Sequence, residues 1–510
     1  MKKILLSVCL LAGLFLTACG PSRAELNATA TRIAADISAT QTAEAPTPTP
    51  TATPTPTPIP THTPEPVTVQ VAPDGSGDYP SLEVAVEAVP PRSTLMLEPG
   101  TYRLEEPLDV SKPLQLVGAG MDQTEIVSGA EGYVVRFSGD GPFAAEDITF
   151  RHRGTAAADV VVVQGGEIAF ARCRFTGAAQ EEKEDRAGLW LQGNTTGVVR
   201  ECEAVENDDI GIFVGGQAQP TLEGNACTGN EDTGIAYFDN AGGVARGNEC
   251  SGNGSDGILV AGQAQPTLER NVCTKNGIGI EYIDNSGGVA RGNECSGNGL
   301  NGIYVVEQAQ PTLEGNVCTD NEKGGIAYQG NAGGVARQNE CSGNKWGIDV
   351  EGQAQPTLEG NVCTDNEYLG IAYFDNAGGV ARQNECSGNT VGIAVGGQAQ
   401  PTLVGNVCTD NTFKGIDYSG NAGGVARQNQ CSGNTTGIYV GEQAQPRLEG
   451  NVCKDNKIIG IAYSDNASGV ARQNECSGNI MGIAVDETAN PELVDNDCHD
   501  NLGDIVDKRP

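Results

Sequence analysis

The stretch Glu359–Asn366 reads EGNVCTDN, and the same eight residues recur at Glu314–Asn321. Near-copies continue through the second half of the chain, and fourteen cysteines from Cys202 to Cys498 stand 22 or 23 residues apart after a first gap of 25. A repeat of this length predicts a solenoid with three short strands and three turns per coil. At ~4.8 Å between strands, fourteen coils would stack into a rod of ~65 Å.

Thirteen of the cysteines, from Cys227 onward, lie in the motif Asn-x-Cys-x-x-Asn. Stacked asparagines can hydrogen-bond the turn backbone, and cysteine acts as a small apolar core residue. A ladder of reduced thiols is therefore predicted. Disulfides remain the alternative, although stacked side chains point the same way and the solenoid holds an odd number, fifteen with Cys173. Zinc is disfavoured because there is no CxxC pair and the chain has three histidines.

Coils alternate between two types, GQAQPTLEGNVCTDN and DNAGGVARQNECSGN, which gives a double repeat. Two residues after the isoleucine of a Gly-Ile pair, valine and tyrosine alternate, as in Val214 and Tyr237. Leu222 alternates with Ala245 in the same manner. Large and small side chains should therefore interleave inside the stack, as close packing requires.

Arginine and glutamate alternate in a third column, for example Glu223, Arg246 and Glu269. An outward column that changes sign at every coil predicts a cross-strand ion-pair ladder. The alternative, an arginine active site, needs one residue beside a carboxylate cluster rather than six equal copies. The repeated arginines are Arg246, Arg291, Arg337, Arg382, Arg427 and Arg472.

The N-terminal MKKILLSVCLLAGLFLTACG has two lysines, an apolar run and a small-residue end, so residues 1–18 are predicted to be an export signal. The sequence Leu-Thr-Ala-Cys at residues 16–19 resembles a bacterial lipobox, which implies cleavage before Cys19 and lipidation of its thiol. The alternative is an ordinary cleaved signal. Residues 19–45 are rich in Ala and Thr, and the Pro/Thr-rich linker 46–66 predicts an extended stalk reaching ~65 Å. The expected location is the cell envelope, on the outer side of the cytoplasmic membrane or in the outer membrane.

The folded body begins with VTVQVAPDGSGDYPSLEVAVEAVP, which predicts a strand, a glycine turn and a short helix near Ser81–Val89. This region and ITFRHRGTAAADVVVVQGGEIAFARCRFTG at Ile148–Gly177 resemble the N-terminal part of pectin methylesterases. The repeats resemble the pectate-lyase-like superfamily. The resemblance implies an all-β, single-stranded, right-handed parallel β-helix with a short N-terminal cap helix. Residues 67–201 would form its capped N-terminal part, and residues 202–510 its regular repeats with a short C-terminal tail.

The resemblance does not extend to the esterase's chemistry. That family follows its CRF-G segment with Gln-Asp-Thr-Leu, where this chain has AAQEEKEDRAGLWL, and neither Asp-Phe-Ile-Phe-Gly nor Gly-Arg-Pro-Trp is present. The family's catalytic residues therefore have no counterparts here, and the esterase activity is expected to be absent.

Candidate saccharide-binding residues lie on and near the strand that contains Gly-Ile. Aromatic side chains there should point outward among Glu281, Asp349, Glu351 and Asp417, and aromatic faces beside carboxylates suit sugar rings. Isolated exposed aromatics are also ordinary on protein surfaces. The turn before Gly-Ile varies between coils, which fits either recognition or drift. The candidates are Phe238, Tyr304, Trp346, Phe374 and Tyr439, with Phe213 beside them.

A second candidate is a column of acids eleven residues before the cysteine. Glu442, Asp465 and Glu487 occupy it in three consecutive coils, at a predicted spacing of ~5 Å. Stacked carboxylates repel unless a cation or a proton intervenes, and oxygen ligands suit calcium. Solvated turn acids are the simpler explanation.

The chain carries a net charge of −35, which argues against nucleic acid as a partner. Two functions remain: a surface scaffold that binds extracellular polysaccharide or a partner protein without catalysis, and a polysaccharide lyase or hydrolase. An enzyme needs localised acids, for which the irregular segment Gly177–Leu191, with Glu184 and Asp185, is the best candidate. Because nearly every polar group of the repeats belongs to a ladder, binding is favoured, and a monomer is expected.

Overall fold

The computed structural model describes residues 64–180 and 184–510. Every described residue belongs to one compact unit, Pro64–Pro510. The predicted signal peptide, Cys19 and all but the last three residues of the linker 46–66 therefore lie outside the described residues. In the described part, no helix has the length and apolarity needed to cross a membrane.

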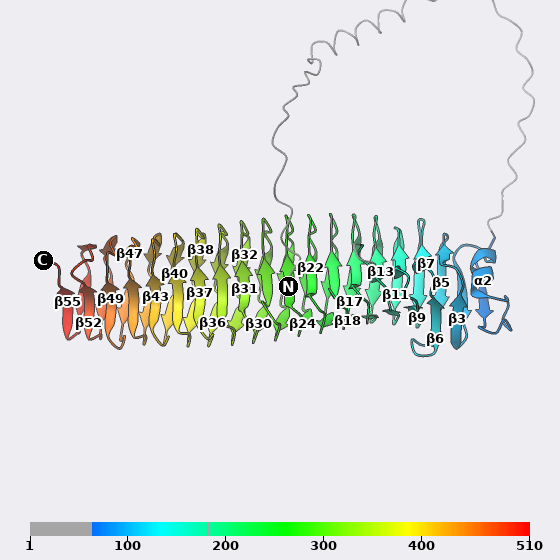
Figure 1. The fold of residues 1–510 in the computed structure, drawn as a ribbon, viewed down its shortest axis with the longest axis horizontal. Helices are drawn as coiled ribbons and strands as arrows, with labels where there is room; N and C mark the ends of the chain where they lie inside the picture. The colour runs from blue at the N-terminus through cyan, green and yellow to red at the C-terminus, as the bar shows by residue number, and fades with distance from the viewer. Residues whose placement is uncertain (1–63, 181–183) are drawn as a thin grey trace, which may run out of the picture. The chain divides into compact units, whose positions relative to one another are not determined.

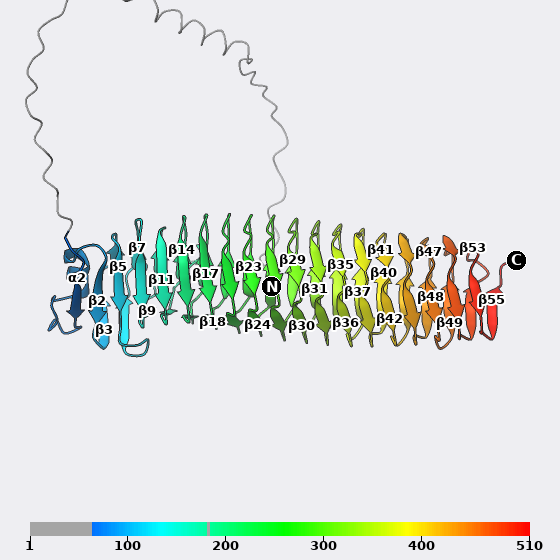
Figure 2. The ribbon, with the colours of Figure 1, turned by 180° about the vertical axis from the view of Figure 1, so that it is seen from behind.

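The described residues wind into a stack of coils, each built from three short strands that pair in parallel with the same strands of the next coil (Figures 1 and 2). The strands form three sheets, here called A, B and C. This confirms the predicted all-β parallel solenoid.

Sheet A has 19 strands, which pair in chain order. It precedes the first asparagine of each repeat. Its strands are β1 (Thr68–Val71), β2 (Ser93–Leu97), β5 (Leu114–Val117), β8 (Phe143–Glu146), β11 (Glu167–Ala171), β14 (Thr196–Arg200), β17 (Gln219–Glu223), β20 (Val244–Arg246), β23 (Thr267–Glu269), β26 (Val289–Arg291), β29 (Thr312–Glu314), β32 (Val335–Arg337), β35 (Thr357–Glu359), β38 (Val380–Arg382), β41 (Thr402–Val404), β44 (Val425–Arg427), β47 (Arg447–Glu449), β50 (Val470–Arg472) and β53 (Glu492–Val494).

Sheet B carries the cysteines at the centres of its regular strands, and successive cysteines are in register, as Cys227 is with Cys250. Its strands are β3 (Gly100–Leu104), β6 (Thr124–Ser128), β9 (Thr149–His152), β12 (Arg174–Thr176), β15 (Glu203–Val205), β18 (Ala226–Thr228), β21 (Glu249–Ser251), β24 (Val272–Thr274), β27 (Glu294–Ser296), β30 (Val317–Thr319), β33 (Glu340–Ser342), β36 (Val362–Thr364), β39 (Glu385–Ser387), β42 (Val407–Thr409), β45 (Gln430–Ser432), β48 (Val452–Lys454), β51 (Glu475–Ser477) and β54 (Asp497–His499).

Sheet C contains the Gly-Ile pairs. The glycine is needed because a Cβ on Gly370 would lie 2.6 Å from the carbonyl oxygen of Gly392 in the next coil. Its strands are β4 (Leu108–Val110), β7 (Gly132–Phe137), β10 (Ala158–Val163), β13 (Ala187–Leu191), β16 (Ile210–Val214), β19 (Ile235–Tyr237), β22 (Asp256–Val260), β25 (Ile278–Tyr282), β28 (Ile303–Val305), β31 (Gly324–Tyr328), β34 (Trp346–Val350), β37 (Leu369–Tyr373), β40 (Val391–Val395), β43 (Lys414–Tyr418), β46 (Thr436–Val440), β49 (Ile459–Tyr463), β52 (Met481–Val485) and β55 (Gly503–Asp507).

The predicted cap helix is α2 (Leu82–Ala88), at the N-terminal end of the stack (Figure 1). Ser81 caps it by accepting a hydrogen bond from the backbone N–H of Val84, and Leu82, Ala85 and Val86 are buried. The helix therefore covers the first coils with its apolar face.

The core is a set of ladders that run through one continuous cluster of buried side chains. Leu222 pairs in register with Ala245, and Val214 with Tyr237, so large and small residues alternate as the repeats predict. The six tyrosines of this column are almost completely buried, and their hydroxyl groups have no hydrogen-bond partner in the described part of the chain. They are Tyr237, Tyr282, Tyr328, Tyr373, Tyr418 and Tyr463.

Asparagines form two buried ladders, as the motif predicts. The side-chain oxygen of Asn316 accepts hydrogen bonds from the backbone and side-chain nitrogens of Asn293, at 3.0 and 2.9 Å. The side-chain nitrogen of Asn316 donates to the carbonyl of Ala290 at 3.0 Å and to Asn339 at 2.9 Å. Each asparagine thus links the same turn in three successive coils.

The fifteen cysteines from Cys173 to Cys498 are free, and all except Cys498 are buried. The prediction of a reduced thiol ladder is therefore confirmed for the described residues. The predicted ion-pair ladder is also present: Arg246 contacts Glu223 at 3.0 Å, and Arg291 contacts Glu314 at 3.0 Å.

Candidate functional site

The outer face of sheet C carries most of the chain's irregular side chains. Because side chains alternate along a strand, Ile212 and Val214 point into the core and Phe213 points outward. Ile210, at the start of the strand, packs in a separate cluster with Phe213. In register with Phe213 lie Trp190 on the preceding coil and Ala236 on the next. This outward column therefore holds side chains of different chemical type in successive coils.

Three aromatic rings stack on this face. Trp190 and Phe213 have ring centroids 3.9 Å apart and planes at 21°, and Phe213 and Phe238 have centroids 5.3 Å apart at 16°. Phe213 is only 7% exposed because its neighbours cover it, whereas Trp190 and Phe238 remain half-buried. We call Trp190, Phe213 and Phe238 the aromatic stack. Because the rings are stacked face to face, they cover one another's faces and present an apolar strip of ring edges at the surface.

A row of carboxylates runs along the same face toward the edge that follows sheet B. Asp159 accepts hydrogen bonds from the backbone N–H of Ala187 at 2.8 Å and from Arg186 at 3.5 Å. Asp209 accepts the backbone N–H of Arg186 at 2.8 Å. Arg186 therefore holds both carboxyl groups in place, Asp159 through its side chain and Asp209 through its backbone N–H. Five acids of this face, at three different strand positions, are here called the carboxylate row: Asp159, Asp209, Asp232, Asp256 and Glu281.

Burial makes these acids hard to ionise. It raises the pKa of Asp159 to about 6, and it raises the pKa of Asp209 to about 6, where repulsion from Asp232 and Asp185 adds to the effect. Burial likewise raises the pKa of Asp232. Carboxyl groups of this kind are partly protonated near neutral pH, so they can donate as well as accept hydrogen bonds.

Asp256 and Glu281 form the most strongly perturbed pair. Asp256 is 3% exposed, its Oδ2 accepts from Ser255 at 3.2 Å, and its Oδ1 has no donor among the described residues. Burial raises the pKa of Asp256 to about 8, where repulsion from Glu281 adds to the effect. Burial also raises the pKa of Glu281 to about 7, with a further contribution from the charge of Asp232.

The structure does not bring the sequence-predicted aromatic candidates together. Phe238 belongs to the aromatic stack, but Tyr304, Trp346, Phe374 and Tyr439 lie on separate coils. Tyr304 bonds Gln329 through its hydroxyl, and Lys414 lies over the ring of Tyr439 at 3.7 Å. These four residues therefore form no continuous binding surface.

Two of the predicted acids next to those aromatics also have local roles. Asp417 pairs with Lys414 at 3.0 Å. Burial, together with repulsion from Glu351, raises the pKa of Asp349 to about 7. Asp349 lies on the same strand as Trp346, but no second aromatic ring stacks there. This is a sparser arrangement than the one at the aromatic stack.

The proposed calcium column has a different geometry from the expected one. Glu442 accepts the backbone N–H of Gly420 at 2.6 Å, and Asp465 accepts the backbone N–H of Glu442 at 3.3 Å. Both residues have positive φ values of 56°, so they serve as turn residues whose carboxylates bond the preceding coil. Within residues 64–180 and 184–510 no three acids, histidines or cysteines are placed to hold a metal ion. Glu442, Asp465 and Glu487 thus do not converge on a calcium site.

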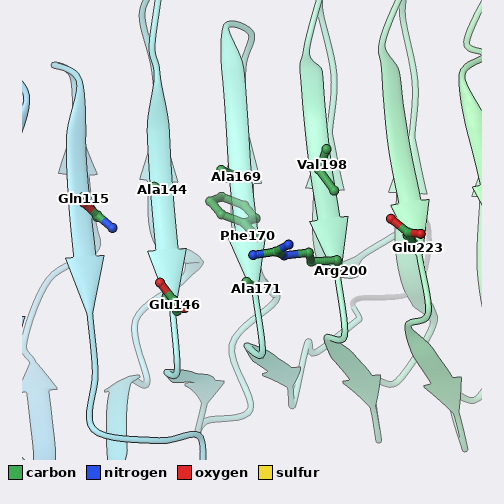
Figure 3. Close-up of a pocket in the computed structure, with 9 residues that line it drawn as sticks. All are labelled: Gln115, Ala144, Glu146, Ala169, Phe170, Ala171, Val198, Arg200 and Glu223. Carbon is green, nitrogen blue, oxygen red and sulfur yellow. The ribbon is translucent and has the colours of Figure 1, made fainter.

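A shallow cavity of about 360 Å³ lies on the outer face of sheet A. Ala144, Ala169 and Ala171 form its floor, and the guanidinium of Arg200 extends toward strand β11, away from Glu223 (Figure 3). Its rim acids already have partners, since Glu146 pairs with Arg172 and Glu223 with Arg246. This cavity is a gap in the ion-pair ladder, left where Ala171 replaces a charged residue. The outer face of sheet C, where acids are buried and perturbed, is therefore the stronger candidate.

Sequence reasoning missed Trp190, Asp159, Asp209, Asp232 and Asp256. A signal was present: aligning NDDIGI, NEDTGI and NGSDGI shows aspartates just before Gly-Ile in three coils, where later coils have Lys, Thr or apolar residues. The segment Gly177–Leu191 was correctly singled out as irregular, since Arg186 and Trp190 come from it. Its acids at 181 and 182 lie outside the described residues, and Glu184 pairs with Arg186 at 2.8 Å.

Comparisons with known proteins agree with this architecture. A family model described as "Right handed beta helix region" matches residues 159–310, 278–408 and 382–498. A pectinesterase/pectinesterase inhibitor from Ficus pumila var. awkeotsang is 36% identical over 127 residues, which cover 21% of this chain. The match spans only 23% of that relative's own length.

Solved structures with similar folds include a pectate lyase, with 15% identity over 58% of this chain and 75% of that one, at a TM-score of 0.36. A GH87 α-1,3-glucanase catalytic domain shows 11% identity over 70% and 66%, at 0.39. The A-module of a mannuronan C-5 epimerase from Azotobacter vinelandii shows 16% identity over 82% and 91%, at 0.23.

Proposed function

The chain belongs to the right-handed β-helix family, and on that premise we propose that it binds a neutral extracellular polysaccharide on the outer face of sheet C without cleaving it. The observation that carries this proposal is the aromatic stack of Trp190, Phe213 and Phe238 beside the carboxylate row. The stack supplies an apolar strip against which a sugar can pack, and the row supplies hydrogen-bond acceptors for its hydroxyl groups.

The charge of the chain favours a neutral ligand. With −35 overall and five acids in the row, the face repels a polyuronate or a nucleic acid. Partly protonated carboxyl groups can both donate to and accept from sugar hydroxyls, which suits an uncharged glycan. The aromatic stack then contributes contact area that does not depend on charge.

The geometry of the acids favours binding over catalysis. In glycosidases the two carboxyl groups stand about 5 Å or more apart, so that the scissile bond fits between them. Asp256 is only 3% exposed, so a scissile bond has little access to its carboxyl group.

Hydrolysis is the second candidate, and one observation favours it. Asp256 retains a proton to unusually high pH, and Asp232 lies one coil away, at ~4.8 Å along the stack. An acid that is protonated near neutral pH beside a carboxylate is the arrangement that general acid–base catalysis requires.

For the N-terminus, we propose the lipid anchor on Cys19 and the Pro/Thr stalk 46–66, which would hold the β-helix away from the cell envelope. The export signal, the lipobox-like residues 16–19 and the alternating prolines support this proposal. Globomycin-sensitive processing and metabolic labelling with palmitate, both lost in Cys19→Ser, would test it.

The binding proposal is tested with a panel of neutral and acidic polysaccharides, scored for retention and for release of reducing ends. Neutral glycans should retain the protein without cleavage, and Trp190→Ala should weaken retention about tenfold or more. Trp346→Ala is the matched control, since it removes the chain's other tryptophan from the same sheet but not from the stack. Equal small losses in both variants would contradict a localised site. Turnover that disappears in Asp256→Asn and Asp232→Asn would favour hydrolysis instead.

A further inference from the structure

The edge of sheet C that follows sheet B carries a row of exposed apolar side chains in the C-terminal third of the stack. Tyr368 is 45% exposed, Phe413 58%, Ile458 42% and Ile480 45%. Backbone hydrogen bonds fix their alignment: Phe413 N–H donates to Thr390, and Ile458 N–H donates to Thr435. We call Tyr368, Phe413, Ile458 and Ile480 the apolar ridge.

The ridge alternates between large and small residues around its centre. Thr390 and Thr435 flank Phe413 on the two adjacent coils, and each turns its hydroxyl back to a carbonyl of the preceding coil, at 2.8 Å. The threonines therefore present little bulk beside the exposed Phe413 ring. Two Phe413 rings from facing surfaces could pass each other in this space.

The charges beside the ridge have opposite signs at equal distances from Phe413. Glu367 is exposed two coils before it, and Lys457 is exposed two coils after it, each ~10 Å away along the axis. Among the described residues neither side chain takes part in an ion pair. The uncharged Thr412 occupies the corresponding position at the centre.

From Tyr368 to Ile458 this pattern is self-complementary under a two-fold rotation through the coil of Phe413, whereas Ile480 falls opposite Lys345. The rotation places Tyr368 opposite Ile458 of a second copy, Thr390 opposite Thr435, and Glu367 opposite Lys457, each twice. An isologous dimer needs such matching of a surface with itself. We propose that the apolar ridge is a dimer interface, on which a second copy of this chain docks in antiparallel orientation.

The size of the surface sets the expected strength. Six coils of a ridge about 10 Å wide give roughly 300 Å² per copy, which is below the ~800 Å² per partner of a stable interface. The net charge of −35 on each copy also opposes association. We therefore expect a reversible dimer with a dissociation constant in the micromolar range or weaker.

Sedimentation velocity over a concentration series tests the proposal, with the full chain carrying Cys19→Ser so that lipid cannot join the copies. The wild-type surface should dimerise at near-physiological salt. Glu367→Lys and Lys457→Glu should each weaken the dimer about tenfold, because each places like charges opposite one another. The double variant should restore it to within about threefold of the original, and Phe413→Asp should abolish it.

Both charged positions are exposed, so the folded state should survive, and circular dichroism serves as the check. A protein that stays monomeric at every concentration would overturn the proposal, as would single reversals that the double variant fails to rescue. A monomer in which Phe413→Asp lowers polysaccharide retention would assign the ridge to the glycan instead. The outcome is separate from the binding test, because Trp190 lies far along the stack from this ridge.

Discussion

Replacing buried Tyr328 with phenylalanine should stabilise the protein. Its ring fills the core with 1% exposure, but its hydroxyl has no hydrogen-bond partner in the described part of the chain. An unsatisfied buried hydroxyl costs ~1–3 kcal/mol, so its removal should raise the free energy of unfolding by about 1 kcal/mol. The ring stays in place, and no cavity forms.

The same reasoning applies to all six tyrosines of the column, which stand two coils, or ~10 Å, apart. Effects at such distances add approximately, so the sixfold Tyr→Phe variant should gain about 6 kcal/mol. The assay is guanidinium unfolding followed by circular dichroism, with the midpoint compared rather than an extrapolated value, since a solenoid need not unfold in one step.

Tyr102→Phe is the matched control. That hydroxyl lies 2.6 Å from the carbonyl oxygen of Val71 and 2.9 Å from that of Glu98, so its loss should destabilise by about 1–2 kcal/mol. If Tyr328→Phe lowered the midpoint as Tyr102→Phe does, the phenol would have a strong partner, and the account of the core would be wrong.

Three further predictions concern the ladders and the acids. Thiol titration of the denatured protein without reductant should find the fifteen cysteines of the solenoid free, while the native protein should react at Cys498 first; blocked thiols would show that the ladder is oxidised. Asn316→Ala should destabilise the protein by several kcal/mol, since it removes the hydrogen bonds of a buried amide. Arg337→Ala, at an exposed ion pair, should change stability by less than about 1 kcal/mol. Similar effects of the two substitutions would refute the claim that the asparagine ladder stabilises the fold more than the ion-pair ladder. Because burial raises the pKa of Asp159 and Asp209 to about 6 and that of Asp349 to about 7, the folded state holds extra protons, and stability should fall as pH rises from about 4 to 7. The triple Asp→Asn variant should flatten that slope in thermal melts, and an unchanged slope would contradict the assignment.

The sequence was sufficient to predict the repeating part of the fold. The 22–23-residue period, the alternation of large and small residues and the Asn-x-Cys-x-x-Asn motif all place side chains on equivalent side chains of the next coil. The structure of one coil therefore predicts that of its neighbours. The structure accordingly confirms the thiol ladder, the asparagine ladders and the cap helix. The pairing of Leu222 with Ala245 is a direct consequence of the double repeat.

The candidate site was harder to predict because it depends on departures from the repeat. Phe213 and Phe238 occupy different columns, and their contact across neighbouring coils arises from ring orientation, which spacing does not reveal. Asp159 of the carboxylate row and its partner Arg186 come from the irregular coils, where the repeat period does not predict which residues lie side by side. For the calcium column, the sequence left two explanations open, and Glu442 and Asp465, which each bond the backbone of the coil before, fit the simpler one of turn acids.

The most direct test of the binding face uses the chain's two tryptophans, Trp190 and Trp346, as separate reporters. In a Trp346→Phe variant, all tryptophan fluorescence comes from Trp190 in the aromatic stack, and in Trp190→Phe it comes from Trp346. Titration with the neutral polysaccharide that is best retained should change the emission of Trp190 saturably and leave that of Trp346 unchanged. A saturable response at Trp346 alone, or equal responses at both, would show that the outer face of sheet C around Trp190 is not the binding site.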